Sequence, residues 1–196
     1  DPEDFERAKT AFEKVLDLEP RRADAAAEIS SLYAYQYEGG SSDALGEIET
    51  WAQTAMEIDP RHAMAVGMLS VHEYFSGNLH RALQTGLRSV SLGPRDAHLH
   101  NGLADVIQRS SIQLARDAYA MAARLDPLYT YPSLNLAHSH GLLGRSNQAL
   151  AVIDGILDLE PDMPAGLLYR AMQIILLDRT DEASAILPRL DALVGA

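Results

Sequence analysis

Histidine is the side chain in this sequence best suited to bind a metal ion, and four of the seven histidines lie in two close pairs. The pairs are His98 with His100 and His138 with His140. On a helix, residues two apart point about 200° away from each other, whereas two ligands of one metal need a spacing of three or four residues. We therefore expect packed or surface histidines here, and no bound metal or other cofactor.

Other patterns that could do chemistry are scarce. The sequence contains no G-x-S-x-G, P-loop, G-x-G-x-x-G or H-E-x-x-H motif. It has no cysteine, which excludes disulfides, thiol catalysis and cysteine-ligated zinc. Acidic residues such as Glu19 and Glu160 stand beside prolines, but they recur there as part of a repeat, so we assign them no acid–base role. The sequence predicts that the protein is not an enzyme.

The charge balance narrows the range of partners. The 28 Asp and Glu residues against 16 Lys and Arg give a net charge of −12, and no basic run is longer than Arg21-Arg22. Because phosphate backbones bind to basic surfaces, we do not expect a nucleic acid as partner. No run of about 18 apolar residues occurs, so we do not expect membrane insertion. An acidic surface favours basic or apolar partners.

The N-terminal stretch DPEDFERAKT is acidic and polar, and it lacks an initiator methionine. It does not have the pattern of a signal peptide. We expect the chain to be a segment of a longer protein. A cytoplasmic location is favoured, and a periplasmic one stays open because a targeting segment ahead of residue 1 would not be visible.

Five prolines divide the chain at nearly regular intervals. Pro20, Pro60, Pro94, Pro127 and Pro161 are 40, 34, 33 and 34 residues apart. The residues 12, 8 and 5 positions before them are mostly small or apolar: Ala8, Phe12, Val15; Ile48, Ala52, Ala55; Ala82, Gly86, Ser89; Ala115, Tyr119, Ala122; Ala149, Ile153, Ile156. A spacing of four and then three residues marks one face of a helix. The proline ends that helix because it cannot donate the helical hydrogen bond.

A second helix is predicted after each proline. Ten residues beyond the prolines, every residue is small: Ser30, Ser70, Ala104, Ala137 and Ala171. Small residues that recur at one position indicate two helices that cross closely. Each interval therefore predicts a pair of antiparallel helices.

A helix pair repeated every 34 residues with this spacing resembles the tetratricopeptide repeat. The interval that ends at Pro127 carries Ala115, Tyr119 and Ala122, the small–aromatic–small pattern of the family's second helix. Further positions match the family's first-helix tyrosine and its inter-helix glycines: Tyr33, Gly77 and Gly144. The family's first-helix tryptophan is absent, so the repeats are degenerate. The array is also loosely similar to the repeat modules of bacterial multidomain regulators.

The resemblance implies an all-α, right-handed superhelical solenoid of antiparallel helix pairs, with about eleven helices. We expect one repeat domain over residues 1–196, with a half unit at 1–20 and units at 21–60, 61–94, 95–127, 128–161 and 162–196.

Two units depart from the period. Six extra residues lie between Tyr33 and Ile48, and two interpretations stay open for them: a tolerated longer turn, or a loop that contacts a partner. One residue is missing between Ile107 and Ala115. In the last unit, Pro188 predicts a kink or an early end of the second helix.

The first helices of such an array line its inner, concave surface, where partners bind. The positions 4, 7, 8, 11, 14 and 15 residues after each proline are predicted to face this groove. Candidate partner-binding residues at these positions are Met64, Met68, Val71, Tyr74, Phe75, His98, Asn101, Asp105, Arg109, Tyr131, Leu134, Asn135, His138, Leu168 and Met172. The apolar members are typical of a contact surface, although any single one could instead fill a gap between repeats. The polar members could hydrogen-bond a ligand backbone.

Three functions are consistent with the sequence. The first is a protein-interaction scaffold that binds a peptide or helix of a partner in the groove. The second is a regulatory or sensor module of a multidomain signalling enzyme or transcription factor. The third is self-association through an exposed end of the array, near Leu187 and Leu193. A chaperone-tail clamp is disfavoured, because Arg109 is the main cation at the groove positions and a two-carboxylate clamp needs several positive donors.

Overall fold

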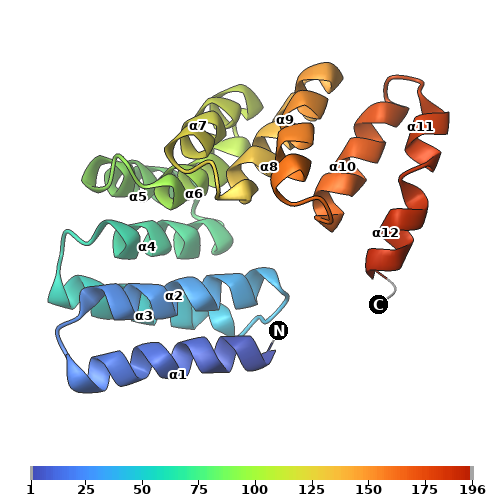
Figure 1. Ribbon diagram of the computed structural model, residues 1–196. Coiled ribbons are helices and arrows are strands. Elements are labelled where there is room, and N and C mark those ends of the chain that lie inside the picture. Colours follow the sequence, from blue (N-terminus) through green and yellow to red (C-terminus); the bar gives the residue numbers. More distant parts are fainter. Residues whose placement is uncertain (1, 195–196) are drawn as a thin grey trace. The chain divides into compact units, whose positions relative to one another are not determined.

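The computed structural model describes residues 2–194, which form helices joined by short turns, with no strand in that range (Figure 1). The helices are α1 (Pro2–Leu18), α2 (Ala23–Glu38), α3 (Ala44–Ile58), α4 (Ala63–Phe75), α5 (Leu79–Leu92), α6 (Ala97–Gln108), α7 (Ile112–Leu125), α8 (Thr130–Leu142), α9 (Ser146–Leu159), α10 (Pro164–Ile175), α11 (Thr180–Ser184) and α12 (Leu187–Val194). The predicted all-α fold of helix pairs is confirmed.

The chain forms two compact units, residues 1–106 and 107–196. In the first unit, α1 packs on α2, α2 on α3, α3 on α4 and α4 on α5. In the second unit, α7 packs on α8, α8 on α9, α9 on α10 and α10 on α11 and α12. Helices adjacent in sequence are therefore adjacent in space within each unit, as in repeat proteins whose units contact only their neighbours.

The five prolines occupy equivalent corners. Each helix that precedes one ends two residues before the proline, and the next helix begins three residues after it, as for Ile58, Pro60 and Ala63. All five prolines are exposed. Inside a helix the ring of a proline would clash with the preceding turn, and the nitrogen could not donate a hydrogen bond. Outside the helix, in the turn, neither problem arises.

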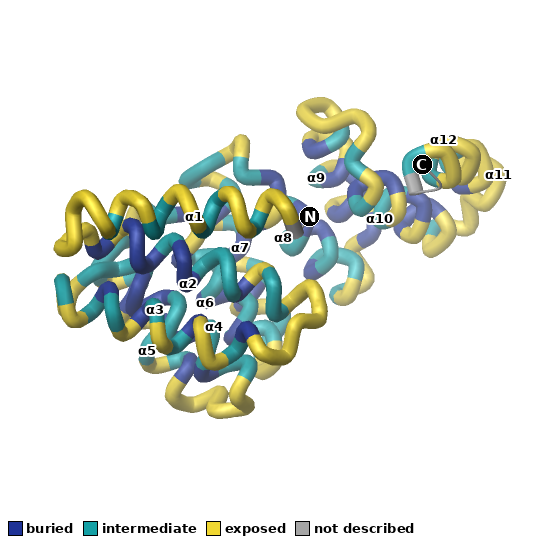
Figure 2. The backbone as a smooth tube through the Cα atoms, turned by 90° about the horizontal axis from the view of Figure 1, so that it is seen from below, coloured by how far each residue is buried: buried dark blue, intermediate teal, exposed yellow. Residues whose placement is uncertain are grey.

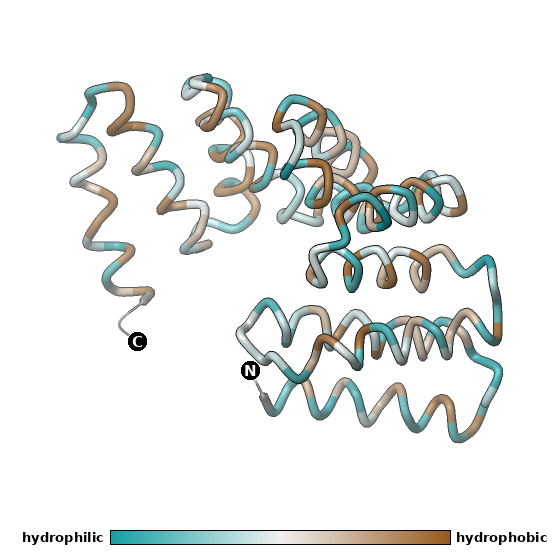
Figure 3. The backbone as a smooth tube through the Cα atoms, turned by 180° about the vertical axis from the view of Figure 1, so that it is seen from behind, coloured by the Kyte–Doolittle hydropathy of each residue, from teal (hydrophilic) through white to brown (hydrophobic). Residues whose placement is uncertain are grey.

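The core of each unit lies where the predicted helix faces meet (Figure 2). Ala82, Ala115 and Ala149, twelve residues before their prolines, are fully buried. Apolar residues recur along the helices between hydrophilic ones, as a one-sided helix requires (Figure 3). In α1 the equivalent face is less covered, and Val15 is 37% exposed.

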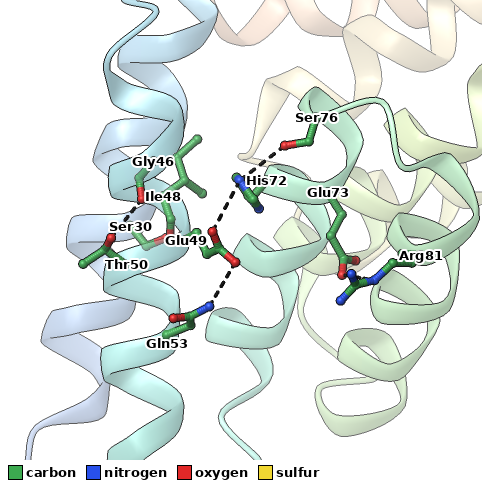
Figure 4. A network of polar contacts seen from close by, with 10 residues as sticks. All are labelled: Ser30, Gly46, Ile48, Glu49, Thr50, Gln53, His72, Glu73, Ser76 and Arg81. Atoms are coloured by element: carbon green, nitrogen blue, oxygen red, sulfur yellow. Dashed lines mark hydrogen bonds and ion pairs between the residues drawn. The ribbon is translucent and has the colours of Figure 1, made fainter.

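The small residues ten positions after the prolines sit at close helix crossings. Ser30 is fully buried on α2, and its hydroxyl donates a hydrogen bond of 2.7 Å to the carbonyl oxygen of Ile48 on α3 (Figure 4). The crossing is thus fixed by a polar link as well as by close packing.

The six extra residues of the repeat at residues 21–60 extend its helices more than its loop. Compared with the pair α4–α5, three of them lengthen α2, two lengthen the turn at residues 39–43 and one lengthens α3. The residue missing from the repeat at residues 95–127 shortens α6 to 12 residues, against 13 in α4.

The second helix of the last repeat is divided in two, as expected from the position of Pro188. Helix α11 ends at Ser184, and α12 begins at Leu187, one residue before the proline. Pro188 therefore occupies the first turn of a new helix, where its missing N–H costs no hydrogen bond. This division gives twelve helices among residues 2–194 where about eleven were predicted.

Candidate partner-binding site

A small hollow opens between α4, α5 and α6 in the first unit. Its volume is about 20 Å³, enough for about one water-sized sphere. It is lined by Met64, Gly67, Met68, Ser70, Val71, Gly86, Ser89, His98, Leu99, Gly102 and Leu103. Four predicted partner-binding residues are therefore brought together here: Met64, Met68, Val71 and His98.

Three glycines line the hollow, and at two of them the chain's own side chains leave little room for a Cβ atom. A Cβ atom on Gly67 would lie 2.9 Å from Cδ2 of Leu99, and one on Gly86 would lie 3.0 Å from Oγ of Ser70. A Cβ atom on Gly102 would have no described atom within 4 Å, apart from its own helix backbone and its two chain neighbours. The space in front of Gly102 is thus not used by the described part of the chain.

Aromatic rings adjoin this region at the end of α4. The rings of Phe75 and Tyr37 have centroids 4.6 Å apart, and those of Phe75 and Tyr74 are 5.2 Å apart. Tyr74 and Phe75 are half-buried. Tyr37 lies in the part of α2 that the six-residue insertion lengthens, so the insertion supplies a packing partner for Phe75.

The polar candidates follow along α6. The side-chain amide of Asn101 donates a 3.2 Å hydrogen bond to Asp105, one helical turn further on. His98 is exposed in the first turn of α6. Arg109 lies in the turn after α6, within the second unit, and is exposed.

In the second unit, the candidates on α8 differ in their exposure. Tyr131 is 59% exposed, and Asn135 is half-buried. The ring of His138 lies 5.4 Å from that of Tyr169 on α10. Leu134 is only 7% exposed, so it packs between helices and offers little surface to a ligand. Leu134 therefore fits the alternative that an apolar residue at a groove position fills a gap between repeats. We no longer count it as a binding candidate.

The candidates on α10 form an exposed apolar strip. Leu168, Met172 and Ile175 are 51%, 45% and 51% exposed, and their spacing of four and three residues places them on one helix face. We call these three residues the α10 strip.

A polar network between α3 and α4 includes Ser76, His72 and Glu49, the residue types of a hydrolytic triad (Figure 4). In a triad, the acid and the nucleophile bind opposite nitrogens of the imidazole. Here Ser76 Oγ lies 3.3 Å and Glu49 Oε2 3.8 Å from the same atom, His72 Nε2. The His72 Nδ1 atom is buried with no hydrogen-bond partner in the described structure. The geometry therefore does not activate Ser76.

The histidines of the two close pairs have separate surroundings. His100 Nε2 lies 3.1 Å from the carbonyl oxygen of Pro94, and burial lowers the pKa of His140. Among the described residues, no group of three or more His, Cys, Asp or Glu side chains is arranged to hold a metal ion. No helix in residues 2–194 is both long and apolar enough to cross a membrane.

Gly102 stands at a predicted groove position, eight residues after Pro94, but it was not among the candidate binding residues. A signal for it exists in the sequence, because a glycine in the middle of a predicted helix, far from any turn, lowers helix stability and needs a reason. Its open surroundings become visible only in the structure.

No protein-family model matches the sequence, and no curated protein has a matching sequence. Solved structures do match the fold. MamA is 14% identical, with a TM-score of 0.64 over 86% of this chain and 91% of its own. YrrB, described as a TPR protein with an unusual peptide-binding site, is 15% identical, with a TM-score of 0.62 over 93% and 92%. TTC0263, a TPR protein of Thermus thermophilus, is 22% identical, with a TM-score of 0.67 over 83% and 88%. The chain has the tetratricopeptide-repeat fold.

Proposed function

We propose that this chain is a protein-interaction scaffold that binds a peptide or helix of a partner protein on the first helices of its first unit. The observation that carries the proposal is the hollow between α4, α5 and α6, which is lined by the partly buried apolar side chains of Met64, Met68 and Val71. Apolar residues that remain partly accessible around a hollow are typical of a contact surface. We call the surface formed by Met64, Met68, Val71, His98 and Gly102 the α4–α6 groove.

Two further observations support binding rather than catalysis. YrrB, which shares the fold, is described as having a peptide-binding site. Among the described residues, the arrangement around His72 resembles a catalytic triad, but both partners lie on a single ring nitrogen. We therefore propose a non-enzymatic role.

The test is a selection of random peptides displayed on phage against the immobilised chain. Enriched peptides are synthesised with a fluorescent label, and their affinities are measured by anisotropy. The Met68→Lys variant places a charge in the α4–α6 groove, and we expect it to weaken binding by about tenfold or more. The matched control is Leu87→Lys on α5, because Leu87 is 53% exposed and does not line the hollow.

Both variants must keep the helical circular dichroism spectrum and cooperative melting of the wild type. The proposal is wrong if no peptide is enriched, or if the enriched peptides bind the Met68→Lys variant as tightly as they bind the wild type.

A second candidate function is self-association through the α10 strip, with a second copy of this chain as partner. Positions in α8 and α10 are equivalent when they lie equally far after Pro127 and Pro161. In α8, the positions equivalent to those of the strip are covered by α10. Leu134 is 7% exposed, and a Cβ atom on Gly141 would lie 2.6 Å from the side chain of Gln173. In α10, the equivalent residues are Leu168 and Ile175, and both are half exposed. The α10 strip of a second copy is apolar in the same way, so the two strips can pack against each other about a two-fold axis.

Light scattering after size-exclusion chromatography over a range of concentrations tests this. We expect a dimer that Met172→Glu dissociates and that Leu114→Glu, at an exposed position on α7, leaves intact. A wild type that stays monomeric at the highest concentration would rule out the dimer.

A further inference from the structure

We propose that the hollow in front of Gly102 is an anchor site for one aliphatic side chain of the partner, and that this side chain is flanked by lysine or arginine. The inference rests on the proposed function and specifies which kind of peptide the α4–α6 groove takes.

The first argument is the glycine itself. Gly102 lies inside α6, six residues before its last residue, and a glycine there destabilises a helix relative to alanine. Gly67 and Gly86 face the same hollow, but side chains of the chain occupy their space. Apart from its own helix backbone and its chain neighbours Asn101 and Leu103, no described atom lies within 4 Å of a Cβ built on Gly102. The internal packing of the unit therefore does not account for this glycine, whereas close approach of a ligand does.

The second argument is the chemistry of the walls. Met64, Met68 and Val71 on α4 face the hollow from one side, and Leu99 and Leu103 on α6 contribute to its lining. An apolar lining of this kind receives an apolar group. The hollow of about 20 Å³ is smaller than a leucine side chain, but the two methionines are unbranched and flexible and can change rotamer to admit one.

The third argument is charge. Within residues 1–106, the first-helix positions predicted to face the groove hold Asp24, Glu28 and Asp105 and no lysine or arginine. The same 106 residues contain 18 of the 28 acidic side chains but only nine of the 16 lysines and arginines. An anchor residue flanked by cations complements the negative charge of these residues, whereas a ligand flanked by carboxylates would be repelled.

The experiment uses the peptides enriched from the random library and two substitutions at Gly102. We expect the enriched peptides to share one Leu, Ile, Val or Met beside Lys or Arg, and replacement of that aliphatic residue by alanine to weaken binding about tenfold or more. Gly102→Leu fills the hollow and should abolish binding. Gly102→Ala should weaken binding while raising the melting temperature by about 2–4 °C, because alanine is the better helix former.

The matched control is Gly155→Ala, a glycine inside α9 that also has no described atom near its Cβ position outside its own helix. It should raise the melting temperature by a similar amount and leave peptide affinity unchanged. A gain in stability together with a loss of binding at Gly102, but not at Gly155, distinguishes an anchor site from a merely structural effect.

The outcomes separate the two proposals. If peptides are enriched and need Met68, but bind Gly102→Leu as tightly as wild type or share no aliphatic residue, the anchor site is wrong and the groove stands. If the enriched peptides are acidic, the charge argument is wrong. If no peptide is enriched, the proposed function is wrong and the anchor site is wrong with it.

Discussion

The hydroxyl of Ser70 on α4 donates a 2.7 Å hydrogen bond to the carbonyl oxygen of Ala82 on α5. Ser30 and Ile48 are joined in the same way, at equivalent positions of the preceding pair. Both serines are buried, and both acceptors stand twelve residues before a proline. The small residue at the crossing therefore brings two helices together and also links them by a hydrogen bond.

Replacing Ser70 by alanine removes this link without adding volume. The carbonyl of Ala82 lies inside α5, where it also accepts a helical hydrogen bond, so it is not left unsatisfied. We expect Ser70→Ala to lower the free energy of unfolding by about 1 kcal/mol, measured by urea denaturation. Ser91→Ala, at an exposed serine on α5, should change it by less than about 0.5 kcal/mol. Equal effects in both variants would mean that the link contributes nothing.

Gly86 faces the same crossing and has little room for a side chain. Its Cβ atom would lie 3.0 Å from Oγ of Ser70 and 3.1 Å from Cδ1 of Leu103. Gly86→Val should therefore force α4 or α6 outward and destabilise the protein by about 1–3 kcal/mol. Thermal melting measures the effect. A Gly86→Val variant as stable as the wild type would show that the helices separate at no cost.

His62 joins two helix starts. Its Nδ1 atom accepts a 3.2 Å hydrogen bond from the backbone N–H of Ala65, which caps α4, and its Nε2 atom lies 3.0 Å from Asp24 on α2. We expect His62→Ala to cost about 1 kcal/mol in stability, as the loss of a helix cap does. His80→Ala is the control, because His80 is exposed on α5.

The same pair predicts a dependence on pH. The hydrogen bond from His62 lowers the pKa of Asp24 below its ordinary value of 3.8. A carboxyl whose pKa is lowered by folding stabilises the protein above its unfolded pKa, and this contribution is lost as the pH falls through the folded pKa. The stability difference between wild type and Asp24→Asn should therefore be present at pH 6 and shrink below about pH 4. A difference that stays constant down to pH 3 would contradict the assignment.

His140 should make the second unit sensitive to mild acid. Burial lowers its pKa below 6.5, and the positive charges of Arg116 and Arg145 lower it further, while a hydrogen bond with Gln148 acts in the opposite direction. Below about pH 6.5 the unfolded chain takes up a proton that folded His140 does not, so stability should fall as the pH drops toward the folded pKa. His140→Gln should lose part of this dependence between pH 7 and pH 5. Unfolding curves across that range, compared with His80→Gln, provide the measurement.

The repeat made most of the fold predictable. Pro60 and Pro94 locate helix ends, and the positions counted from them predicted buried residues such as Ala82. This works because a repeat brings the same helix faces together in every unit, so a position that is small in five copies reports a real contact. Pro188 was equally informative, because its chemistry acts locally.

The candidate site was less predictable. The groove positions included residues that lie around one hollow, such as Met68 and His98, and their role in binding stays a prediction. They also included Leu134, which is buried, because the positions that line a groove also pack between neighbouring repeats. Which role prevails depends on the size of the facing side chain, and a period in the sequence does not contain that information. The significance of Gly102 likewise depends on what surrounds it.

The lengthened pair α2–α3 shows where this chain tolerates change. Its six extra residues leave the three-residue interval between Pro20 and the start of α2 unaltered, and the turn at residues 39–43 is exposed throughout. Chain length is thus adjusted at the tip of a helical hairpin, while the proline corners keep their spacing. An epitope tag or fluorescent reporter inserted at Gly40 would leave both helices of the pair in register, which makes this tip a suitable place to label the protein without disturbing the groove.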